Sequence, residues 1–180
     1  PVVAPMAFNC AAPDTGNMEI LHDHGTDEQK ARWLEPLLDG KIRSCFSMTE
    51  PATSGSDPTN LAASAVLDGD EWVINGLKWF TSGANGADLA IAMVITEPEG
   101  NPYARASMIL VPTDAPGYKL ERPLSVMGHV KGPGHCEVSY TDCRVPKENL
   151  LGERGAGFLI DQDRLGPGRI HHCMRAIGTA

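Results

Sequence analysis

Short runs of β-branched or alternating apolar residues, separated by glycine and proline turns, fill the chain from Lys41 to Gly152. This pattern restricts the possible folds more than any other feature of the sequence. Two of these runs flank Asp68-Gly69-Asp70, which is a hairpin signal. Because such strands follow one another for about a hundred residues, the pattern predicts a β-barrel or sandwich. The expected strands are Ala62–Leu67, Trp72–Ile74, Leu89–Ile95, Ser107–Val111, Tyr118–Glu121 and Cys136–Tyr140.

Helical patterns precede this β region. Asp14 or Thr15 is expected to cap a first helix that stops at Gly25. Thr26 and Gln29 then have the spacing of a capping box, which predicts the start of a second helix.

Proline interrupts the helical pattern at two places. Pro36 is expected to kink or end the second helix, because proline lacks the N–H that an inner helical position needs. After Gly152 the spacing becomes helical again, and Gly166-Pro167-Gly168 predicts an interruption with a kink.

Composition narrows the possible partners and surroundings. The chain has 180 residues and a formal net charge of −8, so bulk electrostatics disfavour nucleic acid and anionic membranes. The five cysteines stand singly, which predicts reduced, buried thiols of an intracellular protein rather than disulfides. No apolar run approaches the length of a membrane span. The chain opens on Pro1 and stops inside a helical pattern, so we expect a fragment of a longer protein.

Two motifs carry most of the functional information. Cys45–Asp57 reads C-F-S-M-T-E-P-A-T-S-G-S-D and runs from strand character into a small-residue turn, which suits a phosphate because backbone dipoles converge there. Asn75–Gly83 reads N-G-L-K-W-F-T-S-G and follows an Asn-Gly turn with two aromatics and two hydroxyls, which suit a flat heterocycle. Together they indicate a flavin nucleotide, whereas an ordinary strand exit and core aromatics are the alternatives.

The motifs also resemble those of a known family. The T-E-P…G-S-D turn, N-G-x-K-W-F-T-S, the run from Arg144 to Gly152 and the D-x-x-R of Asp161–Arg164 match the acyl-CoA dehydrogenases in order. These flavoproteins oxidise the α,β bond of acyl-CoA thioesters. The stretches Pro13–His22 and Arg164–Arg175 are similar to the branch called family members ten and eleven.

The resemblance implies an α+β fold in three parts. An acyl-CoA dehydrogenase-like middle β-barrel or sandwich domain, residues 43–152, would follow the end of an N-terminal helical domain, residues 1–42. Residues 153–180 would be the first helix of a truncated C-terminal helical domain. The resemblance further implies FAD, an acyl-CoA substrate, an electron-transferring flavoprotein as partner, a homodimer or homotetramer, and a role in fatty acid β-oxidation.

In the first motif, the resemblance implies that Phe46, Met48 and Thr49 meet the flavin. Ser56 would touch the FAD phosphates and the pantetheine arm of CoA. The commoner family pattern is one residue shorter between Pro51 and Gly55, so the matching of the residues just before Gly55 stays open.

In the second motif, the resemblance places the aromatic that covers the flavin at Phe80. The hydroxyl that hydrogen-bonds flavin N5 would belong to Ser82. If the strand bulges, Trp79 and Thr81 are the alternatives for these two roles.

Asp161 and Arg164 lie three residues apart, on one face of a helix. The resemblance implies that they bind the CoA moiety, and the alternative is a local surface ion pair. In some relatives a catalytic carboxylate immediately precedes this arginine, which makes Asp163 a candidate base. A solvated acid is the plainer interpretation of Asp163, and the base is expected outside this chain.

The histidines are not expected to bind a metal. Neighbouring helical residues point about 100° apart and so cannot share one ion, and no partner pair has the spacing of a zinc site. His135 is expected to make a structural hydrogen bond rather than to contact the thioester. The residues weighed are His22, His24, His129, His135, Cys136, His171 and His172.

The sequence therefore predicts the middle part of an FAD-dependent acyl-CoA dehydrogenase. A flavin monooxygenase or oxidase on the same scaffold and a non-catalytic fragment are the alternatives. The isolated chain is expected to be inactive and to retain FAD weakly. The bacterial cytoplasm, the mitochondrial matrix and the peroxisome are all compatible locations.

Overall fold

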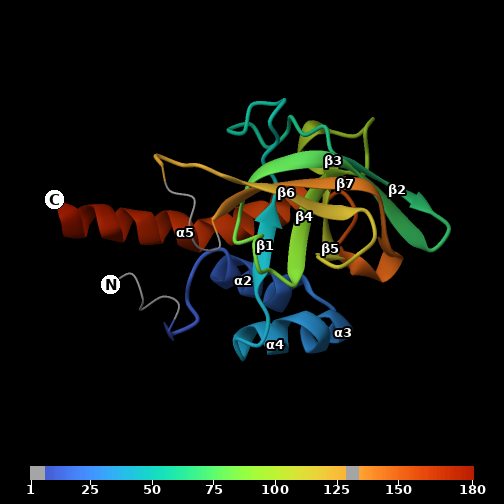
Figure 1. Ribbon diagram of the computed structural model, residues 1–180. Coiled ribbons are helices and arrows are strands. Elements are labelled where there is room, and N and C mark those ends of the chain that lie inside the picture. Colours follow the sequence, from blue (N-terminus) through green and yellow to red (C-terminus); the bar gives the residue numbers. More distant parts are fainter. Residues whose placement is uncertain (1–6, 129–133) are drawn as a thin grey trace.

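The computed structural model describes residues 7–128 and 134–180. Helices come first, strands follow, and one long helix ends the chain (Figure 1). The elements are α2 Asp14–His24, α3 Asp27–Gln29, the π-helical η1 Lys30–Leu34, α4 Glu35–Leu38, β1 Ser44–Ser47, β2 Ser64–Asp68, β3 Glu71–Ser82, β4 Leu89–Ile95, the 3-10 turn η2 Pro102–Ala104, β5 Ala106–Pro112, β6 Tyr118–Leu124, β7 His135–Pro146, the 3-10 turn η3 Lys147–Asn149, β8 Leu150–Leu151 and α5 Gly157–Thr179.

The strands form one mixed sheet of eight strands in the order β6-β7-β3-β2-β4-β5-β8, with β1 pairing parallel to β4. The longest pairing is antiparallel, between β3 and β7. Its register shifts twice, between Ile74 and Gly76 and between Lys78 and Thr81, which marks two bulges in β3. The predicted α+β class with a middle β domain is confirmed.

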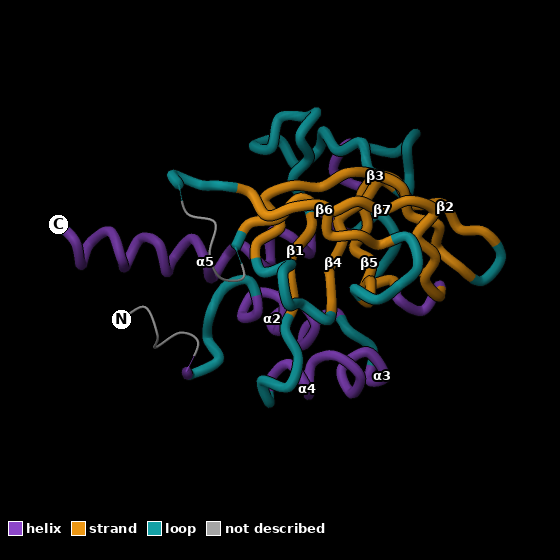
Figure 2. Tube along the Cα trace, in the orientation of Figure 1, coloured by secondary structure: helices purple, strands orange, loops and turns teal. Residues whose placement is uncertain are grey.

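β4 lies at the centre of the packing because both of its faces are buried. Its run of apolar residues divides alternately between two clusters, as expected for a strand with side-chain period two. Ala90, Ala92 and Val94 face the cluster inside the sheet. Leu89, Ile91 and Met93 face the second cluster, which contains residues of α2, η1, α4 and α5. Figure 2 shows α2 to α4 gathered on one side of the strands.

The Asn75-Gly76 pair is not a turn, as the sequence had suggested, but a bulge inside β3. Asn75 and Asp142 of β7 fix it, since Asn75 Nδ2 donates to Asp142 Oδ1 and the Asp142 N–H donates to Asn75 Oδ1. Gly76 has φ +152, and a Cβ there would lie 2.3 Å from Ala63 Cβ. The expected strand Trp72–Ile74 therefore continues through the second motif to Ser82.

The first helix starts at the expected place but without the expected cap. The N-cap position is Pro13, and no side chain caps the helix. Asp14 is instead buried and accepts hydrogen bonds from Ser44. The capping box of Thr26 and Gln29 is confirmed, with both reciprocal hydrogen bonds present.

The two prolines interrupt their helices less than expected. Beyond Pro36 the helix continues to Leu38, and the π-helical turn η1 directly precedes the segment that holds this proline. α5 is one helix with Pro167 inside it, so the predicted interruption is wrong. Pro167 removes only the hydrogen bond to the Asp163 carbonyl, which belongs to an exposed residue that water can reach.

Cys45, Cys136 and Cys143 are buried, whereas Cys10 and Cys173 are exposed, so burial was predicted wrongly for two of the five cysteines. None of the five forms a disulfide. Burial raises the pKa of Cys45 to about 12 and that of Cys143 to about 11. Among the described residues, no helix is both long and apolar enough to cross a membrane.

Candidate functional site

A cavity of about 570 Å³ lies where the ends of β1 and β3 approach α5. It brings together residues from both sequence motifs and from the D-x-x-R segment, although these segments are far apart in the chain. Its lining residues are Ala12, Pro13, Phe46, Met48, Thr49, Gly55, Phe80, Ser82, His135, Asp161, Arg164 and Leu165.

A buried ion pair fixes the first motif. Lys78 Nζ donates to Glu50 Oε1 at 2.7 Å, to the Met48 carbonyl at 2.8 Å and to the Met93 carbonyl at 2.7 Å. Glu50 also accepts two backbone N–H groups from the segment before β2. Burial lowers the pKa of Lys78 to about 8, although Glu50 opposes this shift. Two donors of the ammonium group thus hold Met48 and Glu50 on either side of Thr49, and the third ties them to Met93 of β4.

The second motif reaches the cavity through a bulge. Phe80 has φ +50, which is unusual for a residue with a side chain, and the residue is 44% exposed. Phe80 and Ser82 line the cavity, whereas Thr81 is buried with its Oγ1 3.5 Å from Ser47 Oγ. β3 bulges here, which is the condition under which Trp79 and Thr81 were the alternatives. The residues that line the cavity are nevertheless Phe80 and Ser82, the pair that the family resemblance implied directly.

Ser82 and His135 are cross-strand neighbours of β3 and β7. The Ser82 Oγ and His135 Nδ1 atoms are 2.6 Å apart. The expected structural hydrogen bond of His135 is therefore confirmed, and His135 lines the cavity as well. His129 lies outside the described residues.

Trp79 is not among the residues that line the cavity. Its backbone N–H donates to the Thr49 carbonyl at 2.9 Å, which ties the two motifs together. Its ring packs edge-on against Phe80, with centroids 4.9 Å apart. The Trp79 Nε1–H is buried and has no hydrogen-bond partner among the described residues.

The turn at the end of the first motif contributes a glycine rather than a hydroxyl. Gly55 lines the cavity, and a Cβ at this position would lie 2.7 Å from Thr49 Cγ2. Ser56 is exposed, and its Oγ lies 3.1 Å from Ser54 Oγ. The structure therefore places Ser56 beside the cavity lining rather than in it.

Asp161 is a buried carboxylate without a partner. Its exposed fraction is 1%, and neither carboxylate oxygen has a hydrogen-bond partner among the described residues. Burial raises its pKa, and the nearby Arg164 opposes that shift. The alternative of a surface ion pair is therefore wrong. A buried, unsatisfied polar group is costly, so Asp161 favours a ligand that donates a hydrogen bond.

The guanidinium group of Arg164 lies over an aromatic ring. Its Cζ lies 4.0 Å from the centroid of Phe46, and its Nε donates to Asn17 Oδ1 at 3.1 Å. A Cβ on Gly16 would lie 3.2 Å from Arg164 Cγ, so any larger residue there would crowd this side chain. Burial lowers the pKa of Arg164, against the opposing effects of Asp161 and Glu19.

Asp163 is not brought to the cavity. Its Oδ2 lies 3.0 Å from His24 Nε2 on α2, and half of its side chain is exposed. The residues that line the cavity do not include it. The plainer interpretation, an acid in contact with solvent, agrees with this placement.

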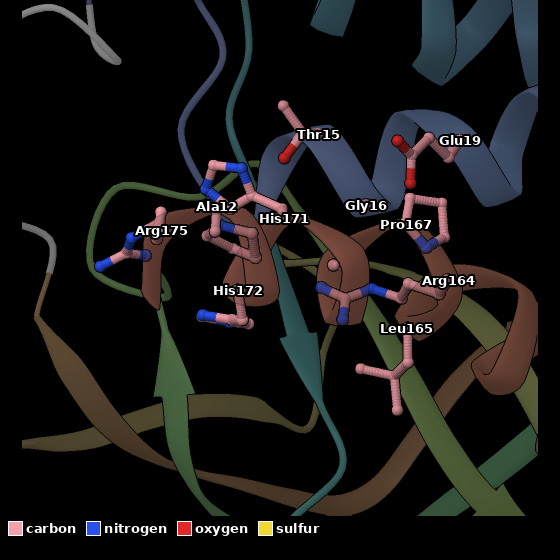
Figure 3. A pocket seen from close by; sticks show the side chains of 12 residues that line it. Ala12, Thr15, Gly16, Glu19, Arg164, Leu165, Pro167, His171, His172 and Arg175 are labelled. Carbon is pink, nitrogen blue, oxygen red and sulfur yellow. The ribbon is translucent and has the colours of Figure 1, made fainter. Parts of the chain in front are cut away.

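A second groove of about 460 Å³ runs between α2 and α5, on another side of Arg164. Figure 3 shows Arg164, His171, His172 and Arg175 of α5 beside Thr15 and Glu19 of α2. The rings of His171 and His172 have centroids 6.0 Å apart. Among the described residues, no three His, Cys, Asp or Glu side chains gather as a metal site.

Sequence reasoning missed the residues that support the site: Gly16, Asn17, Ser44, Glu50 and Lys78. A lysine in the middle of a strand was one available signal. Gly16 and Asn17 lie inside Pro13–His22, the stretch that is similar to one branch of the family, but no pattern in the neighbouring sequence connects them with α5.

The cavity, the motifs and the sheet agree with one family. Residues 45–143, more than half of the chain, match the family model described as acyl-CoA dehydrogenase, middle domain. The chain belongs to the acyl-CoA dehydrogenase family. The resemblance found from the motifs is thereby confirmed.

Individual members support this assignment. The chain is 57% identical to "Probable acyl-CoA dehydrogenase FadE2" of Mycobacterium tuberculosis, over 99% of this chain and 44% of the relative. It is 54% identical to acyl-CoA dehydrogenase family member 11 of Gallus gallus, over 98% of this chain and 23% of the relative. The acyl-CoA dehydrogenase of Geobacillus kaustophilus superposes with a TM-score of 0.75 at 35% identity, covering 81% of this chain and 38% of that one. The chain thus spans less than half the length of these family members.

Proposed function

We propose that this chain forms the middle part of an FAD-dependent acyl-CoA dehydrogenase. The observation that carries the proposal is the single cavity that gathers three distant motifs around the unpartnered carboxylate of Asp161. In this proposal, residues 43–152 are the middle β domain. Residues 1–42 belong to an N-terminal helical domain, and residues 153–180 begin a C-terminal one.

The cavity fits a flavin. The exposed ring of Phe80 offers an apolar face, and the hydroxyls of Thr49 and Ser82 lie in the same lining. Gly55 leaves open the space that a side chain would fill against Thr49. When bound, FAD supplies the acceptor for the hydride that leaves the β-carbon of the acyl chain. Phe46 and Met48 complete the proposed flavin contacts.

The same cavity fits the CoA part of a thioester. Arg164 forms no ion pair with any carboxylate of the described residues, so its charge is available to a phosphate. Asp161 can accept hydrogen bonds from the amide or adenine groups of the ligand, and Ser56, which follows the lining residue Gly55 in the chain, is proposed to meet the pantetheine arm. These groups position the thioester, which is how a protein lowers the barrier of such a step.

The remaining steps rest on parts beyond this chain. A carboxylate is proposed to remove the α-proton while hydrogen bonds to the thioester carbonyl stabilise the enolate. The base lies outside the chain in this proposal, since Asp163 contacts His24 instead of the cavity. An electron-transferring flavoprotein, a homodimer or homotetramer, an intracellular location and a role in fatty acid β-oxidation complete the proposal.

Anaerobic titration tests the proposal. Acyl-CoA is added to the full-length protein loaded with FAD, and the visible flavin absorbance is followed. We expect bleaching in proportion to the bound acyl-CoA. A flavin that stays oxidised with every chain length would contradict the dehydrogenase assignment. Rapid oxygen consumption by the reduced protein would favour the oxidase or monooxygenase alternative.

Two neighbouring hydroxyls separate the proposed contact from its alternative. Ser82→Ala is expected to slow flavin reduction by acyl-CoA about tenfold, because one hydrogen bond of about 1.5 kcal/mol is lost at the reacting centre. Thr81→Val removes a hydroxyl that faces Ser47 in the core and keeps the shape of the side chain. Stopped-flow absorbance measures both rates. Slow reduction in Thr81→Val with a normal rate in Ser82→Ala would transfer the role to Thr81.

A further inference from the structure

A series of partly or fully buried hydrogen bonds connects Arg164 of α5 with Asn17 of α2, Ser44 of β1 and Asp14 of α2. Arg164 Nε donates to Asn17 Oδ1 at 3.1 Å, and Asn17 Nδ2 donates to Ser44 Oγ at 2.9 Å. Ser44 Oγ in turn donates to Asp14 Oδ1 at 2.6 Å. All three hydrogen bonds thus run in the same direction, from Arg164 towards Asp14, and the series ends on a carboxylate.

The last acceptor in this series of hydrogen bonds, the Asp14 carboxylate, is itself held in place, which leaves the Asn17 amide only one orientation. The Ser44 N–H also donates to Asp14 Oδ1 at 2.8 Å, and Arg43 pairs with the other carboxylate oxygen at 3.3 Å. Because the Ser44 hydroxyl proton is given to Asp14, the hydroxyl can only accept from Asn17. A flipped Asn17 amide would face Arg164 with a donor and Ser44 with an acceptor. Asn17 is completely buried, so water cannot repair such a mismatch.

The contacts of Arg164 leave its charged end available. The guanidinium group lies over the Phe46 ring, and a Cβ on Gly16 would press against the stem of Arg164. Among the described residues Arg164 donates a hydrogen bond only through Nε, to Asn17, so the two terminal nitrogens remain for a ligand. A planar guanidinium group that presents two terminal nitrogens matches a phosphate.

We propose that Asn17 is a positioning residue that holds Arg164 in the orientation that binds a phosphate of the CoA moiety. This inference rests on the proposed function for the identity of the ligand. Ser44 and Asp14 contribute to this role only by fixing the orientation of the Asn17 amide. The stretch Pro13–His22, which distinguishes one branch of the family, thereby has a part in substrate binding.

Two substrates test this inference in the full-length protein with FAD bound. Asn17→Leu keeps the approximate volume and removes both hydrogen bonds. We expect its KM for acyl-CoA to rise about tenfold, whereas the KM for the corresponding acyl-pantetheine, which lacks the nucleotide phosphates, stays within about twofold. Ser44→Ala should raise the KM for acyl-CoA by a smaller factor, since only the orientation of Asn17 is loosened.

Asn149 provides a matched control, because it is a buried asparagine that donates to the Leu110 carbonyl away from the cavity. Asn149→Leu should reduce stability without changing the ratio of the two KM values. An equal change for both substrates in Asn17→Leu would make Asn17 merely structural and overturn the inference.

A crystal structure of Asn17→Leu separates this inference from the proposed function. The guanidinium group of Arg164 is expected to leave the face of Phe46, and an unmoved Arg164 would overturn the positioning role. If the wild-type protein neither binds nor oxidises acyl-CoA, the proposed function fails on its own. The ligand named in the inference then falls with it, while the position of Arg164 in the variant still decides the role of Asn17.

Discussion

Replacing Lys78 by methionine is expected to lower the free energy of unfolding by about 3–5 kcal/mol, because a buried ion pair loses one partner. The Lys78 and Glu50 side chains are 0% and 3% exposed, so Glu50 would keep its charge in the interior without a cation. The carbonyls of Met48 and Met93 would lose their donor as well. Urea denaturation of the full-length protein measures this loss. We also expect weaker FAD retention, since Met48 and Thr49 line the cavity.

Lys119 on β6 is the matched control, because it also pairs with a glutamate, Glu121, at 2.6 Å but has a side chain that is 68% exposed. Lys119→Met should change stability by about 0–1 kcal/mol. Adding Glu50→Gln to Lys78→Met should restore part of the loss, since the buried charge is removed. Equal losses in the two single lysine variants would contradict the importance given to the buried pair.

Replacing Arg164 by alanine is expected to lower kcat/KM for acyl-CoA about 10- to 150-fold. This range corresponds to the roughly 1.5–3 kcal/mol of a hydrogen bond to a charged group. The stacking on Phe46 and the hydrogen bond to Asn17 are lost together. Arg164→Lys should recover little of the activity, because an ammonium group cannot reproduce the planar fork. Steady-state kinetics with acyl-CoA and acyl-pantetheine measure the effect.

Arg169 is a suitable control for this substitution. It lies on the same helix, is exposed, and donates to Gln162 at 2.9 Å. Arg169→Ala should leave both substrates within about twofold of the wild type, as expected of an exposed side chain. If Arg164→Ala has the kinetics of Arg169→Ala, Arg164 has no part in substrate binding and the proposed CoA site is wrong.

Strand positions were predictable because alternation and turn residues act locally. The runs around Ala62–Leu67, Leu89–Ile95 and Ser107–Val111 fall on β2, β4 and β5 within a few residues. β3 was predicted too short, because Asn75-Gly76 has the composition of a turn. Whether this pair turns or bulges depends on Asp142, which lies 67 positions away. Local composition carries no information about such a partner.

The candidate site was predictable in its residue types but not in its geometry. The family resemblance implied Phe80 and Ser82 as site residues, and these are the two residues of the second motif that line the cavity. The bulge that turns Thr81 into the core follows from the register of β3 against β7. Ser56 and Asp163, proposed from the same family resemblance, are not among the residues that line the cavity: Ser56 is exposed and Asp163 contacts His24.

The family, the α+β class and the motifs could be identified from the residues alone, since these depend on local order and composition. Packing in three dimensions buries Asp161 without a hydrogen-bond partner among the described residues and encloses Lys78 completely. It also decided that Asn17 holds Arg164 across 147 positions of the chain. Burial and long-range hydrogen bonds depend on how the segments pack together, and no short pattern in one segment specifies the side chains of another.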